Sequence, residues 1–516
     1  MAALSEPQSR AIVFIGFMGA GKSKAAKAAA DAGVEPIDSD ELLERELGMP
    51  IAEFFAREGE GEFRRREEEL VTGVLEHSNG APIALGGGSV LSERVREALG
   101  RHLTVWLDVE APEAWERTAD SERPLAVDRA AFDALHAERR PIYAALADAV
   151  VPGRREVVKR ALPALEAMRA MPPGARMAWA RSASGEYPAF VGPGLLGAGY
   201  RALEGRSFLV TDTTVGGLYG EALEGIAGKV TVEPGEQAKT LASTERVLRE
   251  LARLGMTRAD HVVALGGGVV GDLAGFCAAV FQRGVPVVQV PTTLVGQVDS
   301  AYGGKTGVDL PEAKNYAGAY HLPAAVLADT ATLATLPAAE LAAGFVEVLK
   351  TGLIAGGELW ERARAIETLD PSKLDDVIFA CARTKIEIVA ADERDAGRRA
   401  VLNLGHTVGH GIEAASGYAH YRHGEAVGLG LLAALRLSDA DDLRAELLGI
   451  LARHGLPTSL EASVAVDDVL AALARDKKRT EAGVGFVLLS RPGEPRIGVL
   501  IDEGRVRAAV EELVAR

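Results

Sequence analysis

Cysteine is nearly absent from this chain of 516 residues, in which only Cys277 and Cys381 occur. Two widely spaced cysteines exclude a disulfide framework and fit no CxxC zinc or redox motif, so they favour a reducing compartment, the cytoplasm. Basic residues are also in deficit, with 57 Lys and Arg against 73 Asp and Glu and a formal net charge of −16. This balance excludes a general binder of nucleic acid or of acidic membranes and leaves small molecules as the expected ligands.

Long apolar runs are missing too. The longest, such as Val427–Leu435, fall far short of the ~20 residues that a membrane span needs. No basic-then-apolar leader and no repeat of fixed period is present, which favours a soluble protein. The rest is ordinary globular composition, 48% hydrophobic and 25% charged. At about 150 residues per domain, the length predicts about three domains.

Short apolar runs alternate with helical patterns in the first third, as repeated β-α units require. The expected strands there are Ala11–Ile15, Ile83–Leu85, Leu103–Leu107 and Ala149–Val151. The Met171–Gly174 segment, with two prolines and a glycine, predicts a linker. The first domain is therefore expected over residues 1–171.

Strand patterns start afresh in the second part of the chain. Runs from Ser207–Val210 to Val285–Pro291 are separated by helical patterns, which is typical of a parallel sheet covered by helices. After Thr335 the patterns become mainly helical. The predicted fold class is α/β, with a nucleotide-binding α/β subdomain over residues 172–335 and a mainly helical subdomain over residues 336–516.

A phosphate-binding motif lies between the first strand and the first helix. Gly16–Ser23 matches GxxxxGK[ST], with Gly19 and Gly21 inside the loop. Such a loop turns backbone N–H groups toward phosphates, Lys22 reaches the β- and γ-phosphates, and the Ser23 hydroxyl is placed for Mg²⁺. The motif predicts a nucleoside triphosphate with Mg²⁺ and names no acceptor.

Carboxylates and arginines follow that suit an acceptor with a hydroxyl and a carboxylate. Asp38 and Asp40 are expected to leave one extended strand on the same side, one toward Mg²⁺ and the other as a proton acceptor. A solvated turn is an equally good interpretation of this pair alone. Arg64 and Arg139 suit bidentate capture of a carboxylate.

The motifs GFMGAGKS, DSD, EFRRREE, LGGGSV, RPL and RRPIY together resemble shikimate kinase over residues 8–165. This resemblance implies ATP-dependent phosphorylation of the shikimate 3-hydroxyl, with Asp40 as base and Asp38 on the Mg²⁺ side. The substrate contacts that it implies are Arg64, Gly86, Gly87, Gly88 and Arg139. It also places Arg123 of a lid on the transferring phosphate and Arg117 near adenine. Lys24, where Thr is usual, and a compact lid depart from the family pattern.

A glycine turn and a cluster of polar groups mark the second part of the chain. His261–Asp272 is a strand, a glycine turn and a helix whose spacing differs from GxGxxG, so cofactor binding stays open on this turn alone. His406 and His410 are four residues apart and share one helix face. The pair resembles the HxxxH of zinc sites without the HExxH glutamate, and His423 with Glu347 could complete a site that keeps one position open for substrate. A core or surface role is the better interpretation of either histidine alone, and their clustering favours the metal.

The motifs GGGVVGDLAGF, QVPTTLVGQVDS, GGKTGVDLPEAKN, EVLKTGLI, RRAVLNLGHTVGH and HGEAV resemble 3-dehydroquinate synthase over residues 185–516. The resemblance implies NAD⁺, one Zn²⁺ or Co²⁺, and conversion of 3-deoxy-D-arabino-heptulosonate 7-phosphate to 3-dehydroquinate plus phosphate. It assigns Glu347, His406 and His423 to the metal and His410 to proton handling. The implied cofactor contacts are Asp212, Glu236, Lys239, Gly267, Gly268, Asp272, Thr292, Thr293 and Thr335.

The implied substrate and catalytic groups of this second site are mostly cationic, as a phosphate and a carboxylate require. They are Arg283, Asp299, Lys305, Lys314, Asn315, Lys350, Lys385, Arg399, Asn403 and Lys477. Tyr302, Leu404 and Arg422 depart from the family pattern, the last directly before a metal ligand. The oligomeric state stays open, and a homodimer through the synthase part is one expectation.

Two enzymes of one aromatic-precursor pathway in a single chain are therefore the leading hypothesis. The alternative is a P-loop module fused to a metal- and NAD-dependent polyol or alcohol dehydrogenase, which should lack the phosphate lining of Arg283, Lys305 and Arg399. Intact Lys22, Asp38 and Asp40 argue against a kinase part that only senses nucleotide. Dehydration and reduction steps separate the two reactions, so direct channelling is not implied.

Overall fold

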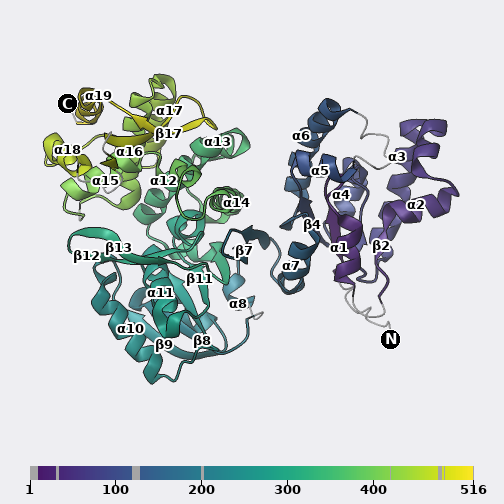
Figure 1. Ribbon diagram of the computed structural model, residues 1–516, viewed down its shortest axis with the longest axis horizontal. Coiled ribbons are helices and arrows are strands. Elements are labelled where there is room, and N and C mark those ends of the chain that lie inside the picture. Colours follow the sequence, from purple (N-terminus) through teal and green to yellow (C-terminus); the bar gives the residue numbers. More distant parts are fainter. Residues whose placement is uncertain are drawn as a thin grey trace. The chain divides into compact units, whose positions relative to one another are not determined.

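The computed structural model describes residues 10–30, 34–118, 128–198, 203–418, 420–474, 479–480 and 483–514. The chain forms two compact units, the first reaching Trp179 and the second starting at Ala180 (Figure 1). No helix within these described ranges is long and apolar enough to cross a membrane.

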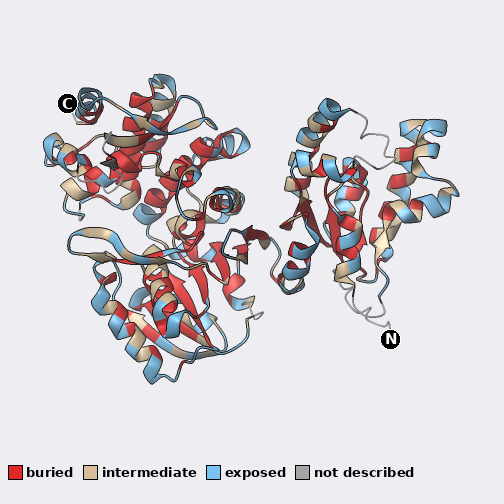
Figure 2. Cartoon of the chain, in the orientation of Figure 1, coloured by how far each residue is buried: buried red, intermediate tan, exposed pale blue. Residues whose placement is uncertain are grey.

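The first unit is a parallel sheet with helices around it, as the sequence predicts. Its strand order is β2-β3-β1-β4-β5, with bounds Ile12–Ile15 (β1), Ile37–Asp38 (β2), Ile83–Ala84 (β3), Leu103–Asp108 (β4) and Ala149–Pro152 (β5). Central β1 is wholly buried, and Phe14 pairs with Ala84 of β3 and Val105 of β4. Figure 2 shows that the strands of this unit are largely buried. Strands covered on both faces need such continuous apolar runs.

Seven helices of this unit are described. They are α1 (Lys22–Ala29), α2 (Ser39–Leu47), α3 (Ile51–His77), α4 (Glu93–Leu99), α5 (Ala111–Thr118), α6 (Arg129–Leu146) and α7 (Arg155–Met168). The long α3 is interrupted at Gly59, whose φ of 83° is not helical. A glycine is needed there because other residues rarely adopt that backbone angle.

The boundary between the units falls a few residues after the expected linker. Strand β6 (Arg176–Arg181) follows the prolines and pairs in parallel with β5 through Met177 and Ala178. The amino-acid composition therefore changes at residue 172, whereas the boundary between the two compact units lies within the next strand, β6.

The second unit opens with a six-stranded parallel sheet. Its order is β7-β14-β11-β10-β8-β9, with bounds Glu186–Gly192 (β7), Ser207–Asp212 (β8), Ile226–Val232 (β9), His261–Gly266 (β10), Val287–Pro291 (β11) and Ala325–Asp329 (β14). Helices α8 (Leu195–Ala198), α9 (Thr213–Tyr219), α10 (Leu241–Arg253) and α11 (Gly268–Val280) accompany it. Strands β12 (Lys305–Leu310) and β13 (Ala313–Tyr320) form an antiparallel hairpin.

The remainder of this unit is mainly helical. Its helices are α12 (Ala338–Ala355), α13 (Gly357–Arg364), α14 (Asp375–Ala391), α15 (His406–Ala415), α16 (His423–Leu437), α17 (Asp441–Arg453), α18 (Val466–Ala474) and α19 (Glu503–Glu511), with small strands β15 (Arg479–Thr480), β16 (Gly483–Leu489) and β17 (Pro495–Leu500). Helix α12 is buried without interruption from Leu341 to Ile354. A helix that is buried all round has no polar face, so the charged residues within it need a specific reason.

Glycines let α16 approach its neighbours at backbone distance. A Cβ at Gly430 would overlap the carbonyl oxygen of Gly405, directly before α15, and one at Gly424 would overlap that of Ala343 in α12. Because α15 begins at His406, α16 at His423 and α12 holds Glu347, this contact brings three candidate metal ligands together.

Replacing Gly430 by Ala should therefore destabilise the second unit. We expect a loss of about 1–3 kcal/mol in the free energy of unfolding, because the added methyl group meets backbone that can yield only by separating the helices. Gly449→Ala is the matched control, since Gly449 is exposed within α17 and a Cβ added there would have no other atom within 4 Å. That change should stabilise by about 0.5–1 kcal/mol. Urea unfolding of both variants tests the opposite signs, and equal effects would contradict the packing argument.

Candidate active sites

The phosphate loop has the backbone conformation that its glycines permit. Gly16, Gly19 and Gly21 have φ values of 142°, 78° and 89°. A Cβ at Gly16 would lie 2.7 Å from the carbonyl oxygen of Leu107. The Lys22 ammonium donates to the carbonyl oxygens of Gly16, at 3.0 Å, and Phe17, at 3.2 Å. The lysine therefore lies over the loop where phosphates are expected.

Arg117 braces this loop from α5. Its guanidinium donates to the carbonyl oxygens of Gly19 at 3.0 Å and Gly153 at 2.6 Å, and it pairs with Glu113 at 2.6 Å. These contacts place Arg117 beside the nucleotide loop. Stacking on adenine stays a prediction.

The positions of the two aspartates at the end of β2 differ from the prediction made from the sequence. Strand β2 ends at Asp38, whose Oδ1 accepts from the backbone N–H of Asp40 at 3.0 Å and of Glu41 at 3.3 Å. The interpretation of one extended strand is wrong, because Asp38 is the N-cap of α2 and Asp40 lies in its first turn. Aspartate is a favoured N-cap, since its side chain satisfies N–H groups that lack partners at a helix start.

Asp40 and Arg64 meet at the Gly86–Gly88 turn. A Cβ at Gly86 would lie 2.5 Å from Asp40 Oδ1, and one at Gly88 would overlap the Arg64 guanidinium. Arg64 also pairs with Glu67 at 2.7 Å. A side chain at Gly86 or Gly88 would therefore have to displace the end of the Asp40 or Arg64 side chain, and the turn brings a carboxylate and a guanidinium close together.

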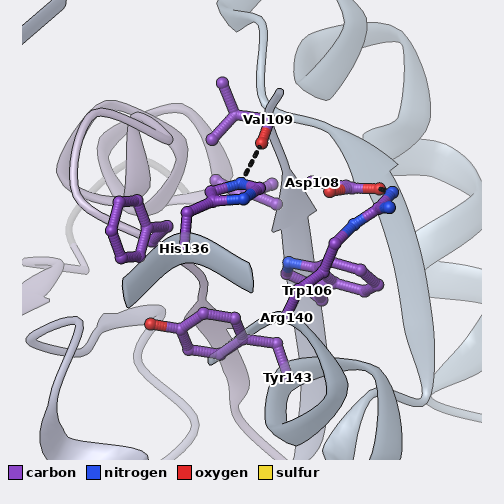
Figure 3. Close-up of a pocket in the computed structure, with 8 residues that line it drawn as sticks. Trp106, Asp108, Val109, His136, Arg140 and Tyr143 are labelled. Carbon is purple, nitrogen blue, oxygen red and sulfur yellow. Dashed lines mark hydrogen bonds and ion pairs between the residues drawn. The ribbon is translucent and has the colours of Figure 1, made fainter. Parts of the chain in front are cut away.

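Helix α6 adds a buried arginine and a tyrosine. Figure 3 shows Tyr143 with His136 and Arg140 around a pocket at the end of β4, where His136 contacts the Val109 carbonyl oxygen and Arg140 pairs with Asp108. The Tyr143 hydroxyl donates to the Gly87 carbonyl oxygen at 2.7 Å.

Arg139 lies beside that hydroxyl. Burial raises the pKa of Tyr143 to about 12, and Arg139 opposes the shift. Arg139 is 5% exposed, and its Nε has no hydrogen-bond partner among the described residues. A buried unpaired donor fits an anionic ligand. Arg123, the expected lid residue, lies outside the described residues.

The glycine turn of the second unit joins the ends of two parallel strands. Gly267 caps α11, and a Cβ there would lie 2.8 Å from Thr293 Cγ2. A Cβ at Gly268 would lie 3.1 Å from Ser300 Oγ. The Thr292 N–H donates to the carbonyl oxygen of Gly266 at 2.9 Å. Ligands bind in such α/β sheets at the carboxyl ends of the strands.

Other expected cofactor residues lie at neighbouring strand ends. Asp212 ends β8 and caps α9, and Thr335 contacts the Tyr219 hydroxyl at 2.6 Å. Lys239 donates to Asp272 at 2.6 Å and to Asn315 at 2.5 Å. Burial raises the pKa of Asp272, and Lys239 opposes that shift. Asn315, expected on substrate, is thus held by an expected cofactor residue.

Three groups converge at the expected metal site. Glu347 Oε1 lies 3.6 Å from His406 Nε2 and 3.5 Å from His423 Nε2. Burial, with nearby Lys350, keeps the pKa of His406 well below its usual value, so its ring is neutral. Besides an ion pair with Lys350, the buried Glu347 oxygens find no hydrogen bond in the described part of the chain. This arrangement fits a cation with one oxygen and two nitrogen ligands.

His410 lies beside these groups, as expected from its position on α15. Its ring centre is 5.3 Å from that of His406 and 6.1 Å from that of His423. His410 also forms a second group of metal-ligand type with Glu413 and His423.

A buried charge layer adjoins Glu347. Asp299 accepts from Lys385 at 2.6 Å and lies 3.8 Å from the Lys350 ammonium. Burial alone would raise the pKa of Asp299, but Lys350 and Lys385 bring it down to about 2. Asp299 belongs to a π-helical turn, Gly296–Ser300, of a kind that often marks functional sites.

Not all expected substrate residues point to an open site. Arg399 is 2% exposed, and its guanidinium donates to the carbonyl oxygens of Gly303 and Glu393. Lys305 pairs with Asp395 at 2.5 Å. Lys314 lies 3.4 Å from Glu413, and Asn403 donates to the Ala400 carbonyl oxygen at 3.1 Å.

For two further expected substrate cations, the structure describes no contact with the residues named above. Arg283 is exposed and has a φ of 72°. Lys477 lies outside the described residues.

The three departures from the family pattern are accommodated. Arg422 pairs with Glu340 at 2.7 Å and Glu425 at 3.1 Å, which ties the start of α16 to α12. The buried Tyr302 hydroxyl donates to the Gln297 carbonyl oxygen at 2.9 Å. Leu404 is fully buried.

Sequence reasoning missed the acids that hold the expected cations. Glu413 contacts Lys314, Asp395 contacts Lys305, and the carbonyl group of Glu393 contacts Arg399. Glu413 carried one signal, because it lies on the same helix three residues after His410. The two loop acids carried none.

Comparisons with known proteins match both parts of the chain to enzyme families. The shikimate kinase family matches residues 18–168, the N-terminal 3-dehydroquinate synthase family matches residues 229–343, and its C-terminal counterpart matches residues 344–479. The 3-dehydroquinate synthase of Symbiobacterium thermophilum is 43% identical over 350 residues, covering 63% of this chain and 98% of the relative. That of Methylococcus capsulatus is 44% identical over 343 residues, covering 63% and 96%.

Solved structures share the fold of the second unit. ValA, a 2-epi-5-epi-valiolone synthase from Streptomyces hygroscopicus subsp. jinggangensis with NAD⁺ and Zn²⁺ bound, is 28% identical, has a TM-score of 0.56 and covers 65% of this chain and 99% of its own. A 2-deoxy-scyllo-inosose synthase complexed with carbaglucose-6-phosphate, NAD⁺ and Co²⁺ is 23% identical with a TM-score of 0.59, covering 66% and 100%. The chain belongs to the 3-dehydroquinate synthase family and carries a shikimate kinase domain before it, so it combines two activities of the shikimate pathway.

Proposed function

We propose that Glu347, His406 and His423 hold a Zn²⁺ or Co²⁺ ion and that the Gly267–Gly268 turn holds NAD⁺. The observation that carries the metal proposal is the buried Glu347 carboxylate, which faces two imidazole nitrogens and, besides its ion pair with Lys350, has no hydrogen bond among the described residues. The dinucleotide fits because a Cβ at Gly267 or Gly268 would fill the approach to the turn. The second unit would then convert 3-deoxy-D-arabino-heptulosonate 7-phosphate to 3-dehydroquinate plus phosphate.

The residues of this site bind and orient a doubly anionic substrate. When bound, the metal acidifies a substrate hydroxyl and NAD⁺ takes up and returns a hydride. Lys350 and Lys385, held by Asp299, present ammonium groups to the substrate. His410 moves a proton beside the metal ligands, and Lys305, Lys314, Arg283, Asn403 and Lys477 bind the phosphate and carboxylate. Arg399 shapes the Gly303 loop from beneath.

The first unit transfers a phosphate group from ATP to the shikimate 3-hydroxyl. Lys22 and the loop hold the ATP phosphates, with Ser23 and Asp38 on the Mg²⁺ side. Both hydrogen bonds of Asp38 to its helix use Oδ1, which leaves Oδ2 toward a Mg²⁺-bound water. Asp40 accepts the hydroxyl proton, while Arg64 and Arg139 hold the substrate carboxylate at the Gly86–Gly88 turn.

The proposal extends to the cellular setting and the assembly. Both cysteines are buried thiols and the chain is acidic, which suits a reducing cytoplasm and small-molecule ligands with no nucleic acid or membrane partner. A homodimer through the second unit is kept as an expectation that light scattering tests. Membership of the 3-dehydroquinate synthase family argues against the dehydrogenase alternative.

Lys22→Ala should abolish shikimate phosphorylation and leave phosphate release from the heptulosonate phosphate unchanged. The reason is that the Lys22 ammonium binds the carbonyl oxygens of its own phosphate loop in the first unit, and separate domains retain separate activities. Both assays on the purified chain, each with and without a chelator, measure this. Loss of both activities in folded protein would contradict the independence of the sites.

Asp40→Asn should reduce kinase kcat by more than tenfold, about 1.4 kcal/mol, with little change in ATP affinity. The change removes a proton acceptor while keeping the side-chain shape. Asp133→Asn is the matched control, because Asp133 pairs with Arg129 on the exposed side of α6. A smaller loss of kcat at Asp40 would mean that another group is the base.

Glu347→Gln or His406→Ala should deplete the second unit of metal, because each removes one of three protein ligands. His410→Ala should retain the metal and lose rate. Metal content per chain, measured by plasma mass spectrometry after gel filtration, separates these outcomes. If His410→Ala loses metal as completely as His406→Ala, the ligand set is wrong.

A further inference from the structure

Glu413 is a buried carboxylate that the proposed reaction does not use. It lies on α15, the helix that carries His406 and His410, and its side chain is 5% exposed. Glutamate is rarely buried to this extent unless it is paired. Its contacts therefore indicate why it is there.

The two Glu413 oxygens reach two different functional side chains. Oε2 lies 3.5 Å from His423 Nδ1, and Oε1 lies 3.4 Å from the Lys314 ammonium. His423 Nε2, on the other side of the ring, lies 3.5 Å from Glu347 Oε1. The His423 ring is thus held between two carboxylates, one of which is a proposed metal ligand.

This arrangement fixes the orientation of the His423 ring. With Glu413 at Nδ1 and Glu347 at Nε2, Nε2 is the nitrogen that faces the proposed metal ligand Glu347. A histidine that binds metal through one nitrogen usually donates its other N–H to such an acceptor, which fixes the ring and increases its basicity.

The same carboxylate restrains Lys314 of β13. Lys314 also lies 3.9 Å from Glu236 and 4.6 Å from the centre of the Tyr418 ring. Lys314 comes from the hairpin of the nucleotide-binding part, whereas Glu413 comes from the helical part. One side chain therefore connects a metal ligand to an expected substrate cation across the two parts of the second unit.

We propose that Glu413 is a positioning residue of the synthase site, which fixes the ring of His423 for the metal and the ammonium of Lys314 for the substrate. The inference rests on the proposed function, because it takes Glu347, His406 and His423 as the ligand set. Glu413 itself contacts neither substrate nor metal in this arrangement.

Glu413→Gln tests the proposal with two readouts on the full chain. The Kd for Zn²⁺, measured by competition with a chromophoric chelator, should rise 10- to 100-fold, and KM for the heptulosonate phosphate should rise as well. At saturating Zn²⁺, kcat should change less than KM. Glu461→Gln is the matched control, because Glu461 contacts the exposed His420 at 2.9 Å, and both constants should stay at the wild-type values.

Lys314→Met separates positioning from a general effect of charge. We expect it to raise KM and to leave the Kd for Zn²⁺ within about threefold of wild type. Lys314→Met could instead lower the Kd for Zn²⁺ by the same factor by which Glu413→Gln raises it. In that case the net charge near the metal accounts for both effects, and the positioning role is overturned. If Glu413→Gln does not fold, as judged by thermal unfolding and NAD⁺ binding, Glu413→Asp replaces it. That variant keeps the charge at a longer distance and should raise the Kd by a smaller factor.

Glu347→Gln distinguishes failure of this inference from failure of the proposed function. If Glu347→Gln binds Zn²⁺ as tightly as wild type, the ligand set itself is wrong. If Glu347→Gln loses Zn²⁺ while Glu413→Gln keeps both constants, only the positioning role is overturned. Binding of a second equivalent of Zn²⁺ that Glu413→Gln abolishes would also overturn it, because His410, Glu413 and His423 would then form a metal site of their own.

Discussion

The burial of opposite charges within α12 is the constraint on which the second unit depends. Glu347 and Lys350 are each 1% exposed within the buried Leu341–Ile354 stretch of this helix, where they are the two charged residues. Removing one partner of such a pair leaves an uncompensated charge that costs about 3–5 kcal/mol. Asp299 and Lys385 extend the pair into a layer of alternating charge. In this layer Lys350 and Lys385 lower the pKa of Asp299 against the effect of burial, and Lys350 does the same for Glu347.

Close packing of the helices is also needed to bring the residues of this site together. His423 reaches Glu347 only because Gly424 and Gly430 let α16 approach the backbone of its neighbours. Arg422, although unusual in the family pattern, strengthens the same arrangement from outside through Glu340. The site residues of the first unit are arranged differently. At its Gly86–Gly88 turn a Cβ would meet the Asp40 or Arg64 side chain, and its buried arginine, Arg139, lies on α6.

Much of both sites could be predicted from the sequence, for a physical reason. The strands of both sheets are buried on two faces and therefore form apolar runs, and the phosphate loop has a fixed spacing because backbone groups bind the phosphates. The prediction wrongly placed Asp40 on an extended strand. Asp38 caps a helix instead, and the DSD pattern does not show whether the chain continues as a strand or starts a helix. Glu393 and Asp395 were missed because their roles arise from contacts with Arg399 and Lys305 that the sequence pattern does not encode.

Each site is built from its own unit in every described contact that carries its chemistry. Asp40, Arg64 and Arg139 gather around a turn of the first sheet, whereas Glu347 and His423 belong to helices that start well beyond the linker. The described residues of the two sites therefore lie on opposite sides of the linker in the sequence. Since dehydration and reduction separate the two reactions, passing an intermediate directly would have no use. What one chain does guarantee is a fixed ratio of the two activities, and this follows from covalent connection alone.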